Sequence, residues 1–178
     1  ILSFGPLTLA PGDTTHFNVA QVMGRGHEAM MENVELADFV VEKDFKLPSA
    51  PPSPQVSVET SSRSILIEWD DRAEDYEDPH RSDSVDQPFE GYRVYKSTQS
   101  SDGPWTLLAE YDIPGNKYGQ NTGIKHEFRD TGLMNNVEYY YTVTAFSKPD
   151  SVLGFPSQSS SRDARAQTVI PGTAPPEK

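Results

Sequence analysis

The chain contains no cysteine, and no apolar run approaches the roughly 18 residues that a membrane helix needs. The first absence excludes disulfides and thiolate metal sites, and the second argues against membrane insertion. Basic residues are scarce, with 15 Lys and Arg against 27 Asp and Glu and a net charge of −12. Because nucleic-acid phosphates and anionic lipids attract basic surfaces, this balance argues against both as partners.

The sequence also lacks a recognisable catalytic motif. Its four histidines are spread along the chain, and no two lie at close spacing. His27 begins a stretch similar to the zinc-peptidase pattern HExxH, but Met31 stands where the second histidine is needed. There is no GxSxG elbow and no phosphate-binding loop. We therefore expect no enzyme activity and no cofactor, apart from the metal ion considered below.

Proline and glycine are plentiful, at 15 and 12 residues, which is typical of short strands joined by turns. From residue 55 to residue 169, apolar and polar residues alternate in about seven short stretches. The stretches are QVSVET, SILIEW, GYRVYKS, WTLLAEY, HEFRD, EYYYTVTAFS and ARAQTV. Seven short strands separated by turn residues predict an all-β, immunoglobulin-like sandwich.

The first 47 residues have a different pattern. In residues 6–24 a Pro-Gly-Asp turn separates two extended runs, which predicts a β-hairpin. Residues 28–46 repeat apolar side chains at three- and four-residue spacing, which predicts a helix. A lone hairpin is marginally stable, so this segment needs a partner sheet, either in an upstream β-rich domain of which residues 1–47 would be the C-terminal part or in another chain. Four prolines make residues 48–54 a stiff linker, and residues 171–178 form a linker-like tail.

Residues 55–170 resemble a fibronectin type III domain at specific positions. Trp69 closes the stretch ILIEW, where this family has the core tryptophan of its second strand. In FRDTGLMNNVEYYYTVTAF, Leu133 precedes Tyr139 by six residues, which is the spacing of the family's tyrosine corner. The resemblance implies a seven-stranded sandwich in which the Tyr139 hydroxyl bonds back to the backbone. It also implies core positions for Trp69, Tyr92, Tyr139 and Tyr141.

The order of these segments is similar to that in large multidomain surface proteins of environmental bacteria. In those proteins a β-rich domain ending like GPLTLAPGD is joined through a helix and a Pro-rich linker to a fibronectin-like module. The resemblance implies a non-catalytic structural or interaction module, extracellular or on the cell surface, that contacts protein partners, neighbouring domains or subunits. One form is a building block of a surface assembly, completed by neighbouring strands. The alternative is an accessory module, binding substrate or polysaccharide, of a secreted hydrolase whose catalytic domain is absent.

The sequence departs from the fibronectin pattern in a long acidic stretch between the second and third expected strands. Its eight carboxylates are Asp70, Asp71, Glu74, Asp75, Glu77, Asp78, Asp83 and Asp86. Calcium prefers six to eight oxygen ligands, so this stretch is a candidate Ca²⁺ site. The candidate ligands are Asp70, Asp71, Glu74, Asp75 and Asp78. The order does not match the D-x-[DN]-x-[DN]-G loop, so a solvated loop without metal stays open as the alternative. Residues 111–127 form a second long insertion.

Overall fold

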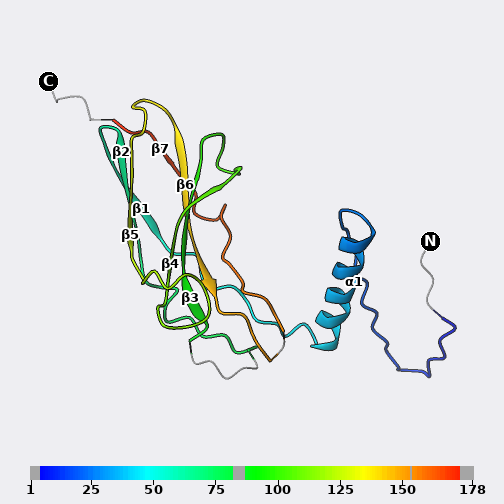
Figure 1. The fold of residues 1–178 in the computed structure, drawn as a ribbon. Helices are drawn as coiled ribbons and strands as arrows, with labels where there is room; N and C mark the ends of the chain where they lie inside the picture. Colours follow the sequence, from blue (N-terminus) through cyan, green and yellow to red (C-terminus); the bar gives the residue numbers. More distant parts are fainter. Residues whose placement is uncertain (1–4, 82–86, 153, 173–178) are drawn as a thin grey trace. The chain divides into compact units, whose positions relative to one another are not determined.

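The computed structural model describes residues 5–81, 87–152 and 154–172, and it divides the chain into two compact units, Ile1–Lys46 and Leu47–Lys178 (Figure 1). Helix α1 (His27–Glu42) lies in the first unit. Each of the seven stretches with a strand pattern contains a strand of the second unit. The strands are β1 (Val56–Ser61), β2 (Ser64–Trp69), β3 (Phe89–Ser97), β4 (Thr106–Asp112), β5 (Glu127–Thr131), β6 (Tyr139–Ser147) and β7 (Gln167–Val169).

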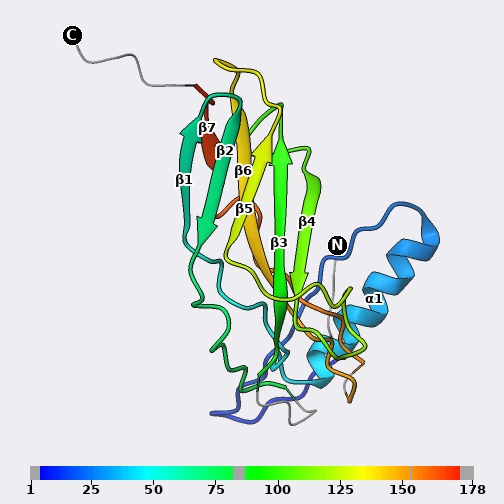
Figure 2. The ribbon, with the colours of Figure 1, turned by 60° about the vertical axis from the view of Figure 1, so that its left-hand side comes forward.

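The strands of the second unit form two antiparallel sheets that face each other (Figure 2). One sheet has the order β1-β2-β5, and the other has the order β4-β3-β6-β7. The chain therefore changes sheet between β2 and β3, and changes again on either side of β5. This arrangement is a fibronectin type III-like sandwich, as the sequence predicted.

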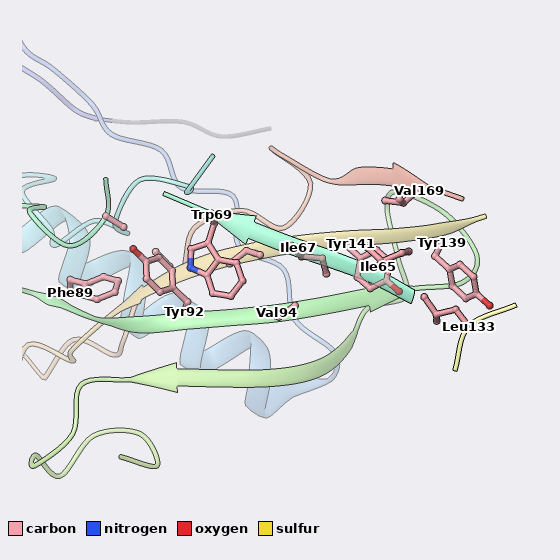
Figure 3. Packing of buried hydrophobic residues seen from close by; sticks show 13 residues of the cluster. Ile65, Ile67, Trp69, Phe89, Tyr92, Val94, Leu133, Tyr139, Tyr141 and Val169 are labelled. Atoms are coloured by element: carbon pink, nitrogen blue, oxygen red, sulfur yellow. The ribbon is translucent and has the colours of Figure 1, made fainter. Parts of the chain in front are cut away.

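The core lies between the two sheets (Figure 3). Side chains at every second position of a strand point to the same face, so one face of each sheet is apolar. The main contributors are Ile65, Ile67 and Trp69 from β2, Tyr92 and Val94 from β3, and Tyr139, Tyr141, Val143 and Ala145 from β6. The four aromatic residues predicted for the core are all buried, with at most 6% of any of them exposed.

The tyrosine corner is formed as its spacing predicted. Leu133 is buried, and the Tyr139 hydroxyl accepts a hydrogen bond from the Met134 N–H at 3.1 Å. The Leu133 N–H donates in turn to the Arg63 carbonyl at 3.1 Å. These bonds fix the connection before β6 to the turn between β1 and β2, at the end of the core where Figure 3 shows Leu133 and Tyr139.

A polar contact also joins the two sheets. Asp130 of β5 accepts hydrogen bonds from Lys96 Nζ at 2.9 Å and from the Tyr141 hydroxyl at 2.8 Å. Lys96 and Tyr141 belong to β3 and β6, in the opposite sheet. Burial, together with the Asp130 carboxylate, raises the pKa of Tyr141, so its hydroxyl remains a donor at physiological pH.

The predicted N-terminal hairpin is not formed within the described residues. The Pro-Gly-Asp turn is present, because the Asp13 N–H donates to the Ala10 carbonyl and the Asp13 carboxylate accepts the Ala10 N–H. The runs on either side of it do not pair as strands in residues 5–26. A two-stranded ribbon without a sheet or helix to cover it gains too little to offset the entropy of ordering it. Residues 1–4 lie outside the described residues.

Helix α1 is shorter than the predicted span of 28–46. It begins after Gly26, whose carbonyl accepts the Met30 N–H at 3.2 Å. It ends at Glu42 because Asp44 and Phe45 adopt positive φ angles of 52° and 60°, outside the right-handed helical region. No side chain of α1 is buried, and α1 is not long and apolar enough to cross a membrane. The described part of the first unit, residues 5–46, has no buried residue at all.

Candidate functional site

Three long connections meet at one end of the sandwich, which we call the loop end (Figure 2). They comprise residues 70–88, 113–126 and 148–156, of which 82–86 and 153 are not described. The Arg81 guanidinium donates to the carbonyls of Lys148 and Pro149 at 2.7 and 3.0 Å. The Lys148 N–H donates to the Pro88 carbonyl at 2.7 Å. The first and third connections are therefore bonded directly to each other.

The candidate calcium ligands lie in the first connection, but the structure does not bring them to a common point. Across the described ranges, no three Asp, Glu or His side chains are placed to share a metal ion. Asp71 and Asp75 are exposed. Asp83 and Asp86, which belong to the same acidic stretch, lie outside the described residues. The calcium site therefore stays a prediction, and calcium addition is its test.

Two of the candidate ligands already have partners within the protein. Asp70 accepts the Gln55 N–H at 2.9 Å and the Arg72 Nε–H at 2.6 Å. Burial acts to raise the pKa of Asp70, but these bonds and the Arg72 charge outweigh it and lower that pKa. Asp78 accepts the Ser49 N–H at 2.7 Å through one oxygen and the His80 N–H at 2.9 Å through the other.

Glu74 forms a contact that sequence reasoning missed. Its Oε1 lies 2.6 Å from His126 Nε2 and accepts a hydrogen bond from the Tyr92 hydroxyl at 3.2 Å. The His126 ring also meets the Tyr92 ring edge-on, with centroids 5.7 Å apart. Residues 74 and 126 are far apart in the sequence, and no local spacing indicates that they meet. The pairing of β2 with β5 brings them together, because Glu74 follows β2 and His126 directly precedes β5.

Glu74, His126 and Tyr92 form a cluster that joins the first and second connections, and the cavity beside it offers no side-chain nucleophile. A cavity of about 260 Å³ lies beside it, lined by Trp69, Asp70, Asp71 and His126. The Tyr92 hydroxyl has a raised pKa, chiefly because it is buried and also because Glu74 is close, so it stays protonated. Neither Ser nor Thr lines that cavity, and carboxylates and a half-exposed His126 form its polar wall. The lining therefore contains a base, His126, but no side-chain hydroxyl that this base could activate as a nucleophile.

The second connection is held by a buried carboxylate at the end of β4. Asp112 is fully buried, and it accepts hydrogen bonds from the N–H groups of Gln120, Asn121 and Thr122 and from the Thr122 hydroxyl. The bonds from the Asn121 N–H and the Thr122 N–H are 2.8 and 2.6 Å long. Burial acts to raise the pKa of Asp112, but the four hydrogen bonds outweigh it and hold that pKa below its usual value.

Glu90 provides a second buried anchor for the same connection. Both of its carboxylate oxygens accept hydrogen bonds from Asn116 Nδ2, at 2.9 and 3.1 Å. Its side chain is fully buried, and burial raises the pKa of Glu90 although the Asn116 bond acts in the opposite direction. Sequence reasoning missed this anchoring role of Glu90, because a glutamate at the start of a strand is usually solvent-exposed. Two buried carboxylates therefore define the path of residues 113–123.

Comparison with known proteins yields structural neighbours of low sequence identity. No family model matches the chain, and no curated protein matches it either. An Fn3-like protein from Clostridium thermocellum is 20% identical, with a TM-score of 0.37, and the match covers 74% of this chain and 97% of that one. A β-1,2-glucanase from Parabacteroides distasonis is 17% identical, with a TM-score of 0.40, over 72% of this chain and 14% of the enzyme. The pectate lyase PelI from Erwinia chrysanthemi is 16% identical, with a TM-score of 0.38, over 66% and 28% of the two chains. The chain thus spans only a small part of either enzyme.

Proposed function

We propose that this chain is a non-catalytic structural and interaction module of an extracellular or cell-surface bacterial protein. The observation that carries the proposal is the contrast between the two units. The sandwich has a filled core, whereas the described residues of the first unit bury no side chain. Large apolar side chains there are open to solvent, including Phe17, Val19, Met23 and Phe45, with exposed fractions of 49–76%. A surface of this kind is typical of a site that contacts another protein or domain.

The extended segment before α1 supports completion of this unit by a neighbouring strand. Its backbone has no strand partner in residues 5–26. Phe17 and Val19 lie two residues apart and share one face of an extended chain. A groove of about 700 Å³ separates residues 18–23 from the apolar side of α1. We infer that a strand of a neighbouring domain or subunit adds to this segment and covers the groove.

The test is the mass of the native polypeptide together with its assembly state. A mass far above the 19.8 kDa of this chain would identify neighbouring domains of the same polypeptide as the partner. A mass equal to that of this chain, within a large assembly, would identify neighbouring subunits. A native monomer of 19.8 kDa would refute the proposal, because its apolar surface would then have no partner.

A second candidate is an accessory, polysaccharide-binding module of a secreted hydrolase. Its supporting observation is two aromatic rings, Tyr118 on the second connection and Tyr111 at the end of β4, each next to a lysine. Lys117 Nζ lies 5.2 Å from the Tyr118 ring, and Lys125 Nζ lies 5.3 Å from the Tyr111 ring. Aromatic rings of this kind can stack on sugar rings. Co-sedimentation with insoluble polysaccharide should then fall when Tyr118 is replaced by alanine, and no binding of the wild type would exclude this candidate.

A further inference from the structure

The proline-rich segment at the start of the second unit, residues 48–54, packs against the sandwich. Pro48, Pro51 and Pro54 are buried, while Pro52 is exposed. The three buried prolines are spaced by three residues, which is the repeat of a polyproline II helix. One side of the segment is therefore covered by protein along its length. The sequence predicted a stiff linker here, and this linker is packed along that side.

Hydrogen bonds to the acidic connection hold both ends of this segment. At its start, the Ser49 N–H donates to Asp78 Oδ2 at 2.7 Å, and the Ser49 hydroxyl lies 2.5 Å from the Tyr76 hydroxyl. At its end, Gln55 donates its N–H to Asp70 Oδ1 at 2.9 Å. The Gln55 side-chain oxygen also accepts from Arg72 Nη2 at 2.9 Å. The four partners in the acidic connection lie within residues 70–78.

From these contacts we propose that the acidic connection is a binding site for an extended proline-rich segment, occupied by residues 48–55 of the same chain. Prolines have no N–H, so half of this eight-residue segment has no backbone donor. Asp78 and Asp70 accept two of the four donors that remain, those of Ser49 and Gln55. The carboxylates thus lie where the few donors of such a ligand are found. These contacts account for two of the eight carboxylates of the connection, Asp70 and Asp78.

The contact works as a latch between the sandwich and the chain that precedes it. While it is closed, the segment belongs to the sandwich and cannot act as a spacer. Its hydrogen bonds lie outside the core between the sheets, so the latch can open while β1–β7 stay folded. Opening would release residues 47–55, and nine extended residues span roughly 30 Å. Opening of the latch would therefore lengthen the connection between the sandwich and the chain that precedes it.

Hydrogen exchange at single amides of the full chain, measured by NMR, tests the proposal. We expect the Ser49 amide to be protected at least about tenfold relative to an unstructured peptide. Replacing Asp78 with alanine should remove that protection, while the Gln55 amide, held by Asp70, stays protected. The matched control is Glu77→Ala, which removes the neighbouring, exposed carboxylate and should change neither amide. Slow exchange of the Val94 and Val143 amides would confirm that the sandwich is intact in each variant.

Two results would overturn the proposal. The first is a Ser49 amide that exchanges as fast in the wild type as in an unstructured peptide. The second is a Ser49 amide that is as protected in Asp78→Ala as in Glu77→Ala. Because Asp78 also accepts the His80 N–H, its loss could disturb the connection itself. Tyr76→Phe removes only the hydroxyl next to Ser49 and should increase Ser49 exchange several-fold. If the Ser49 amide exchanges at the wild-type rate in Tyr76→Phe and is also fully protected in Asp78→Ala, the latch is ruled out.

Discussion

Substitution of Asp112 by alanine should lower the free energy of unfolding by about 3–4 kcal/mol. The carboxylate is fully buried at the end of β4 and accepts four hydrogen bonds, from three backbone N–H groups and the Thr122 hydroxyl. Hydrogen bonds to charged groups contribute about 1.5–3 kcal/mol each. Residues 120–122 are exposed, so water can accept hydrogen bonds from the donors that lose the Asp112 carboxylate. We therefore use a loss of about 1 kcal/mol for each hydrogen bond.

The assay is thermal and urea unfolding of the full chain. For a domain of this size the expected loss corresponds to a drop in Tm of roughly 10 °C. Asp102→Ala is the matched control, because Asp102 lies in an exposed turn and its carboxylate has no hydrogen-bond partner among the described residues. The control should change stability by less than about 0.5 kcal/mol.

The pH dependence gives an independent check on the same residue. The hydrogen bonds hold the pKa of Asp112 below the value of about 3.9 found in unfolded chains. Its stabilisation is therefore complete above about pH 4 and is lost as the pH falls through the lowered pKa. The stability difference between wild type and Asp112→Ala should shrink over that acidic range. A variant no less stable than Asp102→Ala at pH 7 would refute the anchoring role of Asp112.

Three further predictions concern other parts of the sandwich. Tyr139→Phe removes the acceptor for the Met134 N–H and should cost about 1–2 kcal/mol in urea unfolding, whereas an unchanged midpoint would show that the corner adds no stability. Glu90→Gln should raise the Tm at pH 7, because burial raises the pKa of Glu90 and so disfavours its charged form, while the amide oxygen still accepts from Asn116. This gain in Tm should disappear as the pH falls through the raised pKa of Glu90, because the wild-type side chain is then also neutral. A Tm of Glu90→Gln below that of the wild type at pH 7 would contradict the reasoning. Millimolar calcium should shift the Tm by less than about 1 °C, because several carboxylates of the acidic connection already have partners, and a rise reversed by chelator would instead establish a calcium site.

The strands and the core could be predicted because their signals are local or have a fixed spacing. Alternation along SILIEW predicted a strand, and the fibronectin resemblance predicted a core position for Trp69, which the sandwich buries. The six-residue spacing of Leu133 and Tyr139 predicted the tyrosine corner, because that motif is made within one short segment. Neither prediction depends on which strands become neighbours in the sheets.

The same local reasoning failed for the N-terminal hairpin. The turn at Ala10–Asp13 forms, because its two hydrogen bonds involve residues three apart. The strands on either side need a sheet or helix to pack against, and local sequence does not show whether one is present. The contact of Glu74 with His126 was missed for a related reason, since it joins two connections that the pairing of β2 with β5 brings together.

The sequence by itself determined the sandwich, its core residues and the absence of cysteine chemistry, because period-two alternation, turn residues and composition can be read along the chain. Only the tertiary structure shows which partners two carboxylates of the acidic connection have. Sequence spacing did not indicate these partners. In the fold, Asp70 and Asp78 lie beside the N–H groups of Gln55 and Ser49, residues 15 and 29 positions earlier in the chain. The Gln55–Asp70 contact lies next to the Val56–Trp69 pair, so it depends on the pairing of β1 with β2 and not on either segment alone.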